Sequence, residues 1–268
     1  SVEHNRSISN GADEFYFTGR DWENADSYIR QAYIWYPYAH QPIQGAEDWN
    51  VLYTSVQYAN TVLRELDNIG DINSGQYNRL KGTALFFRSF IFYQLLQVYA
   101  PDYEPFSSSL NHEGIALRLT ADINKHSVRS SLQDSYRQAE QDLKEALALL
   151  PSSMSGDNLP SAAAAAALLA RLYLTTGEYP GAQEYATKAL ALKGTLADFN
   201  TFQSQADYTI RMMDQEMIFY SVASRYTAGL INRVYIDTLL VDSYTDADLR
   251  RSFYFTRLPE GRYSYQGS

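Results

Sequence analysis

The order of apolar and polar residues along the chain predicts a series of amphipathic helices. Over 48–69, apolar residues recur every three or four positions, which is the spacing that gathers them on one face of an α-helix. The same spacing predicts four more helices, over 76–99, 131–150, 161–175 and 180–192. Glycine or proline stands at most of their ends, and both residues interrupt helices. We therefore predict an all-α, mostly helical fold in which long irregular loops join helical hairpins.

The helical pattern is weaker at both ends of the chain. Near the N-terminus it predicts one short helix around 24–34. Toward the C-terminus, residues 217–222 (MIFYSV) predict a short buried strand or an extended segment, and residues 235–244 predict a further helix. Residues 259–268 are rich in Gly and Tyr and lack a period, so we expect no regular element there.

These differences in pattern divide the chain into three parts. Residues 1–47 form a loop-rich segment with scattered aromatic residues, and residues 48–194 form the helical domain. Residues 195–268 form the start of a second loop-rich region. Because no concluding element is predicted there, we expect this region to be truncated and the chain to be part of a longer protein.

The fourth and fifth predicted helices resemble one tetratricopeptide (TPR) repeat, with Gly177 at the turn between them. Small residues at Ala170 and Ala182 let two antiparallel helices approach closely, while Tyr173 and Tyr179 fill the space beside them. An alanine-rich hairpin without any repeat is the alternative. The sequence departs from the TPR pattern at Ala166, where Trp is usual, at Ala186, where an aromatic residue is preferred, and at Gly194, where Pro is common.

Two polar features have structural interpretations. Arg88 lies in the middle of an apolar helix, where a guanidinium needs a carboxylate or carbonyl partner. We interpret it as a pin between helices and not as a ligand group. Ser131 and Asp134 have the spacing of a capping box at the start of the third helix.

Composition and charge narrow the class of partner. The net charge is −9, which disfavours nucleic acid and anionic lipid because both require clustered Lys and Arg. No apolar run is long enough to cross a membrane. The chain has no Cys, so disulfides and thiolate metal sites are excluded. Aromatic residues make up 14% of the chain, including 23 Tyr, and tyrosine suits half-exposed binding surfaces.

No catalytic or metal-binding pattern stands out. The four His are scattered, and the chain lacks nucleophile-elbow, Walker A and dinucleotide-binding motifs. We therefore predict no enzyme and no cofactor, and we assign no metal-ligating residue; the sequence leaves open whether a metal is bound in the loops. A glycoside hydrolase needs only two well-placed acids, and the 31 Asp and Glu cannot be sorted by sequence. A hydrolase with an unrecognised acid pair stays open as an alternative.

Four segments of the chain carry motifs. They are Trp49-Asn50-x-Leu52-Tyr53 with Ala59-Asn60-x-Val62-Leu63; Leu80-x-Gly82-x-Ala84-x-x-x-Arg88-Ser89-Phe90 with Tyr93 and Leu96; Arg129-Ser130-Ser131 with Tyr136, Asp142-Leu143, Ala146 and Leu150-Pro151; and Ala166-x-x-Leu169-Ala170-Arg171-x-Tyr173-Leu174 with Gly177, Tyr179 and Ala182. In their order and spacing these segments resemble the SusD/RagB family, with a weaker fifth at 246–250, so that the resemblance covers about 48–250. Thr83 and Ser89 depart from the usual Glu and Ala of that family.

The resemblance implies a surface-exposed outer-membrane lipoprotein that captures nutrients for a TonB-dependent, SusC-like transporter. It implies that the TPR-like helices pack on that transporter and that a less regular half holds glycan. Proteins of this family are about twice as long, so the chain corresponds to the N-terminal half to two-thirds. The lipidated Cys that anchors such proteins lies outside this chain, and we expect contact with the membrane only through that anchor.

We expect the chain to bind glycan without catalysis and to bind no nucleic acid. Sugar rings present an apolar face that stacks on flat aromatic side chains. The candidate ligand-binding residues are Trp22, Trp35, Tyr36 and Tyr38, which lie in the loop-rich segment, whereas Trp49 is interpreted as a core residue. Ordinary packing is the alternative for each of them. A peptide-binding SusD/RagB-type or TPR adaptor protein is the alternative function.

Overall fold

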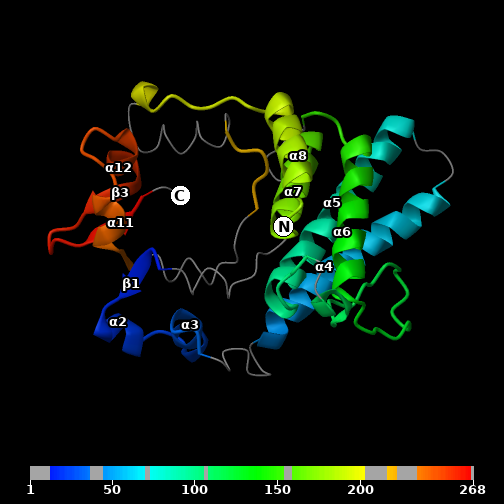
Figure 1. The fold of residues 1–268 in the computed structure, drawn as a ribbon, viewed down its shortest axis with the longest axis horizontal. Coiled ribbons are helices and arrows are strands. Elements are labelled where there is room, and N and C mark those ends of the chain that lie inside the picture. The colour runs from blue at the N-terminus through cyan, green and yellow to red at the C-terminus, as the bar shows by residue number, and fades with distance from the viewer. Residues whose placement is uncertain are drawn as a thin grey trace. The chain divides into compact units, whose positions relative to one another are not determined.

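The computed structural model describes residues 13–36, 45–69, 73–105, 108–153, 159–202, 216–221 and 234–266. Two compact units can be distinguished in it. Unit 1 comprises Trp49–Gly194 and Ile218–Ser221, and unit 2 comprises the described residues within 3–48, 195–217 and 222–268. Helices dominate the described residues, as the all-α prediction requires (Figure 1). The division into 1–47, 48–194 and 195–268 as domains stays a prediction.

Unit 1 is built from long helices joined by loops. The five helices predicted from the apolar spacing are present, with ends that differ from the predicted ones by up to three residues. They are α4 (Gly45–Asn68), α5 (Ser74–Tyr99), α6 (Leu132–Leu149), α7 (Ala162–Thr175) and α8 (Tyr179–Leu192). A short 3-10 helix, η1 (Ser108–Asn111), lies in the long loop before α6.

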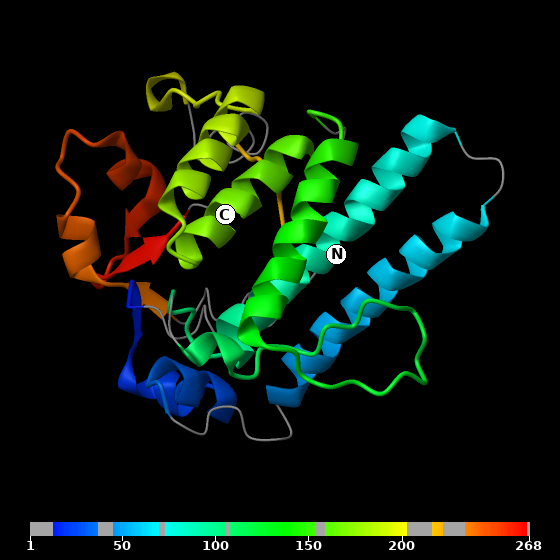
Figure 2. The same cartoon turned by 45° about the vertical axis from the view of Figure 1, so that its right-hand side comes forward.

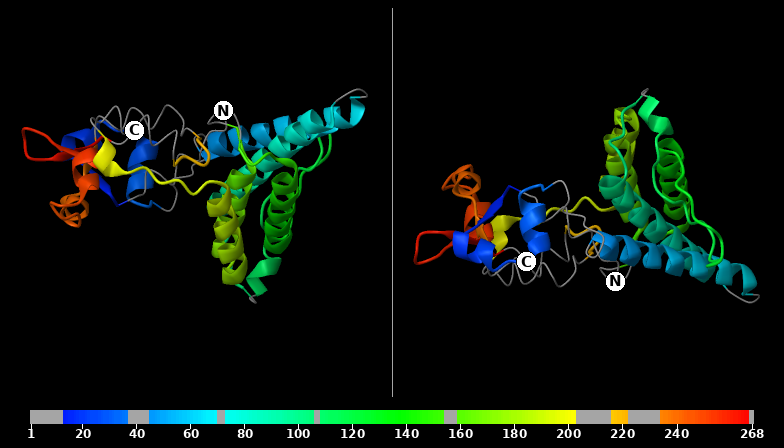
Figure 3. Two further views of the ribbon diagram at one scale, coloured as in Figure 1. Left: turned by 90° about the horizontal axis from the view of Figure 1, so that it is seen from above. Right: turned by 90° about the horizontal axis from the view of Figure 1, so that it is seen from below.

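From α5 onward, each helix of unit 1 packs on the next one along the chain. α5 packs on α6, α6 on α7 and α7 on α8, and Figures 2 and 3 show α7 and α8 side by side. Gly177 ends α7 with a φ of 75°, a left-handed conformation that suits glycine at a helix C-terminus. The predicted turn of the TPR-like hairpin is therefore present.

α5 is the central helix of the core of unit 1. Thirteen of its residues between Gly82 and Leu96 are buried. They include apolar residues of the predicted face and aromatic residues beside that face, so the helix is buried on several sides. Gly82 marks its closest approach to the end of α6, since a Cβ there would lie 2.9 Å from Leu150 Cγ. A larger residue at this position would push the two helices apart.

Arg88 is a structural pin, as predicted. Its Nε and Nη2 donate to the two carboxylate oxygens of Asp142 on α6, each at 2.7 Å, and its Nη1 donates to Asn60 Oδ1 on α4 at 2.9 Å. Burial raises the pKa of Asp142, and the Arg88 guanidinium opposes that rise. One guanidinium thus joins three helices inside the core.

The start of α6 shows the predicted cap. Ser131 Oγ accepts the backbone N–H of Asp134 at 3.0 Å, and the Ser131 hydroxyl donates to the Asp134 carboxylate at 2.8 Å. The second bond differs from a complete capping box, in which the third residue binds the backbone N–H of the cap.

Unit 2 contains short helices and a four-stranded antiparallel sheet. The strands β1 (Phe15–Phe17), β2 (Val234–Ile236), β3 (Phe255–Arg257) and β4 (Tyr263–Tyr265) lie in the order β1-β2-β4-β3. The short helices are α2 (Gly19–Glu23), α3 (Ser27–Tyr33), η2 (Phe199–Thr201), α11 (Thr238–Asp242) and α12 (Leu249–Tyr254).

The sequence prediction for unit 2 was partly wrong. Only 238–242 of the helix predicted over 235–244 is helical, because Val234–Ile236 pairs with β1 instead. Residues 259–268 were predicted to hold no element, yet Tyr263–Tyr265 forms β4 between two other strands. The helix expected around 24–34 is present as α3. Residues 217–221 form neither a helix nor a strand, with a bend at Ile218, so the predicted short buried strand is absent from the described part of this segment.

The described helices include none that is long and apolar enough to cross a membrane. Within the described part of the chain, no group of three or more His, Asp or Glu side chains is placed to hold a metal ion.

Candidate ligand-binding surface

The N-terminal part of unit 2 holds three of the four candidate aromatic residues. Trp22 lies on α2, and Trp35 and Tyr36 follow α3, whereas Tyr38 lies outside the described residues. Thr18 caps α2 by accepting the backbone N–H of Asp21 at 3.2 Å, so the turn between β1 and α2 is fixed locally. The two helices therefore place their aromatic residues close to β1.

Trp22 is a packing residue of this region. Its ring centroid lies 5.6 Å from that of Tyr33 and 6.4 Å from that of Phe17. Tyr33 also contacts Phe17 edge-on at 5.1 Å and Phe15 at 6.0 Å. These four rings form what we call the aromatic support: Phe15, Phe17, Trp22 and Tyr33. Tyr33 joins all the others, and the sequence analysis did not single it out.

The end of α3 differs from the aromatic support because its apolar side chains face solvent. Trp35 is 79% exposed, Tyr36 46% and Ile34 54%. Large aromatic residues in globular proteins usually bury most of their surface, so three adjacent exposed apolar residues form an unusual surface. We call residues 34–36 the aromatic tip.

The backbone of the aromatic tip is fixed by hydrogen bonds. Tyr36 N–H donates to Gln31 O at 2.9 Å and Trp35 N–H donates to Ala32 O at 3.1 Å, which is the Schellman pattern that ends many helices. This pattern places Trp35 in the left-handed region, at a φ of 54°. Glycine normally occupies that position, and any other residue there is strained by about 1–2 kcal/mol.

The strain at Trp35 makes this position a candidate for ligand binding. Left-handed backbone held by a non-glycine residue is concentrated at functional sites, where the surrounding structure maintains it. Here the backbone hydrogen bonds of the helix end maintain it. Trp35 and Tyr36 are thus exposed candidates for stacking on a ligand, next to the polar last turn of α3 with Arg30 and Gln31.

Trp49 lies in the core of unit 1, as the sequence indicated. Its ring contacts Tyr53 at 4.7 Å and Tyr99 at 5.0 Å, and the Arg129 guanidinium lies 5.3 Å from its centroid. It packs against the main hydrophobic cluster and is not a ligand-binding candidate.

A comparison with protein families finds one match. Residues 4–174 match the model of a SusD-like family described as "Starch-binding associating with outer membrane". No curated protein matches the chain.

Several solved structures share the fold. A SusD superfamily protein from Bacteroides vulgatus aligns with a TM-score of 0.75 at 16% identity, over 96% of this chain and 61% of that one. A SusD-like carbohydrate binding protein from the same species aligns with a TM-score of 0.71 at 18% identity, over 98% of this chain and 58% of that one. A laminarin binding SusD-like protein aligns with a TM-score of 0.54 at 19% identity, over 74% and 41%. The chain spans less than two thirds of the length of each of these proteins.

Proposed function

Because the chain belongs to the SusD-like family of starch-binding proteins that associate with the outer membrane, we propose that it binds glycan at the bacterial cell surface without catalysis. Proteins of this family are generally binding proteins and not enzymes. The observation that carries the proposal is the aromatic tip, where Trp35 and Tyr36 are held exposed by the end of α3.

The chemistry of the tip suits a sugar ring. The C–H face of a pyranose stacks on a flat aromatic ring, and the hydroxyl groups at its edge bind polar side chains nearby. An exposed indole whose backbone is already fixed by hydrogen bonds loses less conformational freedom when a ligand stacks on it. The aromatic support then serves to hold β1, α2 and α3 together beneath the tip.

The wider role in nutrient uptake is part of the same proposal. In it, the chain belongs to a surface lipoprotein that delivers glycan to a TonB-dependent, SusC-like transporter. The family description supports association with the outer membrane. Co-purification of the tagged full-length protein with an outer-membrane transporter from its native cells tests this part separately.

Affinity electrophoresis through gels containing starch, laminarin or xyloglucan tests glycan binding. We expect at least one glycan to retard the chain, and Trp35→Ala and Tyr36→Ala to reduce that retardation at least about tenfold in affinity, as for removal of a stacking residue. The matched control is Tyr58→Ala, which removes an exposed ring from α4 in unit 1.

Three outcomes would contradict the proposal. Equal binding by Trp35→Ala and the unchanged chain would remove the tip from the site. New reducing ends after incubation with glycan would show catalysis. Binding to a panel of oligopeptides with no binding to any glycan would favour a peptide-binding protein.

A further inference from the structure

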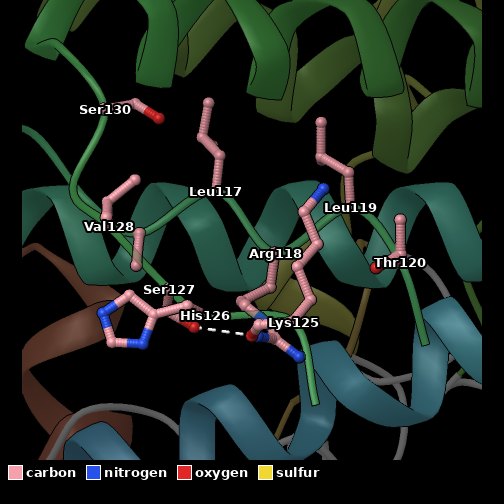
Figure 4. Close-up of a pocket in the computed structure, with 10 residues that line it drawn as sticks. Leu117, Arg118, Leu119, Thr120, Lys125, His126, Ser127, Val128 and Ser130 are labelled. Carbon is pink, nitrogen blue, oxygen red and sulfur yellow. Dashed lines mark hydrogen bonds between the residues drawn. The ribbon is translucent and has the colours of Figure 1, made fainter. Parts of the chain in front are cut away.

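The loop between α5 and α6 in unit 1 encloses a cavity of about 170 Å³, shown in Figure 4. It lies between two stretches of the same loop that run past each other. The backbones of these stretches are joined where Gly114 N–H donates to Ser130 O at 2.7 Å and Ser130 N–H donates to Ile115 O at 2.9 Å. We call this cavity the loop pocket. Its lining residues that bear on the argument are Arg118, Thr120, Lys125, His126, Ser127 and Ser130.

Side chains of α4 hold the loop pocket in shape. Tyr53 Oη accepts the N–H of Ala116 at 2.9 Å, Gln57 Nε2 donates to Ala121 O at 2.8 Å, and Asn60 Nδ2 donates to Arg118 O at 2.8 Å. Asn60 also accepts a hydrogen bond from the buried Arg88. The loop is therefore tied to the ionic pin of the core, and a ligand would not have to order it first.

The loop pocket is positively charged, although the chain as a whole carries a net charge of −9. Its lining includes Arg118, Lys125 and His126 and no acidic residue. The Arg118 guanidinium donates to neutral groups, namely Asp122 O, Ser127 Oγ and Lys125 O. Among the described residues, none of these three basic side chains forms an ion pair with a carboxylate. The charges of Arg118 and Lys125 are thus available to an anion.

Hydrogen-bond donors in the loop pocket are also available. A guanidinium has five N–H donors, and Arg118 uses Nη1 twice and Nη2 once, which leaves two. The side chains of Lys125, His126, Thr120 and Ser130 make no hydrogen bond to another described residue. A carboxylate or sulfate oxygen needs several such donors and no acceptor.

The size of the cavity limits the ligand. Pockets for drug-sized molecules measure roughly 300–1,000 Å³, whereas the loop pocket measures about 170 Å³. It has room for one sugar residue or its charged substituent, and not for a folded oligosaccharide. The rest of a polymer would extend into solvent across the exposed side of Lys125, His126 and Val128.

We propose that the loop pocket binds the anionic substituent of an acidic glycan, such as the carboxylate of a uronic acid or a sulfate ester. The ligand class rests on the proposed glycan-binding function. The pocket is separate from the aromatic tip in sequence and in unit, so its preference for charge can be tested independently of stacking at the tip.

The test compares polygalacturonate, a sulfated galactan and neutral laminarin in affinity electrophoresis and isothermal titration. The variant is Lys125→Gln with His126→Gln, two exposed positions whose change disturbs no hydrogen bond of the described residues. The matched control is Lys188→Gln, an exposed lysine on α8. We expect the double variant to weaken binding of the acidic glycan roughly five- to tenfold, to flatten its salt dependence and to leave laminarin binding unchanged. Stronger binding of polygalacturonate identifies carboxylate as the preferred group, and stronger binding of the sulfated galactan identifies sulfate.

The outcomes separate this inference from the proposed function. Binding of laminarin alone, or equal binding of acidic glycan by the double variant, overturns the loop pocket while glycan binding stands. If no glycan binds, the proposed function fails. The loop pocket is then tested by NMR: the chemical shifts of the His126 ring are followed during titration with sodium sulfate or sodium acetate, with sodium chloride as the control. A saturable shift that Lys125→Gln weakens supports an anion site, and the absence of a shift overturns it.

Discussion

Trp35 holds a backbone conformation that glycine adopts without strain. Its side chain is 79% exposed. An exposed tryptophan at a strained position is a candidate for a role outside folding. Substitutions at Trp35 can therefore test separately its effect on glycan binding and its effect on the free energy of unfolding.

We predict that Trp35→Gly raises the free energy of unfolding by about 0.5–1 kcal/mol while weakening glycan binding as strongly as Trp35→Ala. Glycine removes the left-handed strain of about 1–2 kcal/mol, and its greater freedom in the unfolded chain offsets part of that gain. Urea unfolding and affinity electrophoresis measure the two effects. Trp35→Ala keeps the strained backbone and is the control, for which no gain in stability is expected. A loss of more than about 1 kcal/mol in Trp35→Gly would mean that the indole is structural.

Arg88, in contrast to Trp35, is buried and contributes to stability in the core. We predict that Arg88→Met lowers the free energy of unfolding by about 3–5 kcal/mol, because it leaves the buried Asp142 carboxylate without its partner. Replacing both residues, as in Arg88→Met with Asp142→Leu, should recover most of that loss. Chemical denaturation of the two variants checks this, and a double variant no more stable than the single one would contradict it.

The helices could be predicted from sequence because each one repeats its apolar spacing over several turns. α6 and α7 also carry serine caps, Ser131 and Ser161, that accept backbone N–H groups. The strands could not be predicted, since each has three residues, too few to show alternation. β2 is defined by a partner at the other end of the chain, and local pattern carries no information on it.

The candidate site was predictable in part. Their position as aromatic residues in a loop-rich segment indicated Trp35 and Tyr36, whose roles as ligand contacts stay predictions. The same reasoning could not separate them from Trp22, because packing against Phe17 and Tyr33 depends on how β1, α2 and α3 fold together. The left-handed Trp35 could not be anticipated either, since tryptophan has no preference for that conformation.

Helix packing in unit 1 predicts a loss of stability at alkaline pH. Burial raises the pKa of Tyr53 on α4 and of Tyr136 on α6 to about 12 each, from an ordinary value of about 10. Between these values the unfolded chain releases the protons and the folded chain keeps them, so the free energy of unfolding falls as pH rises. We expect a fall on the order of 2 kcal/mol for each tyrosine between pH 10 and 12.

Urea unfolding at several pH values measures this fall. Tyr136→Phe removes one of the two protons and should reduce the slope against pH accordingly. Tyr58→Phe changes an exposed ring of α4 and should leave the slope unchanged. Equal slopes for Tyr136→Phe and the unchanged chain would show that Tyr136 does not contribute.

At the scale of the whole molecule, the chain leaves unit 1 after Gly194 and returns to it at Ile218–Ser221. Phe219 anchors the return, since its ring lies 5.0 Å from Phe86, 5.6 Å from Phe90 and 6.0 Å from Phe87. Unit 1 is therefore completed by a segment that follows its helices in sequence.

We predict that Phe219→Ala lowers the free energy of unfolding of unit 1 by about 2 kcal/mol, less than for a fully buried phenylalanine because the ring is only partly buried. Hydrogen exchange should become faster for backbone amides of α5, which carries the three partner rings. Phe219→Leu keeps part of the contact and should lose about half as much. Unchanged exchange in α5 would show that the returning segment does not stabilise the helices.

The pairing of β1 with β2 also sets an order of events while the chain is being made. The helices of unit 1 follow one another and can associate as they leave the ribosome, each meeting a neighbour already present. Phe15–Phe17 must wait for Val234–Ile236, the partner strand, across a separation of roughly 200 residues. Until then the aromatic rings of β1 lack their sheet and are open to wrong association. The helical half therefore matures first, and the surface proposed to bind glycan is completed only after β2 has been made.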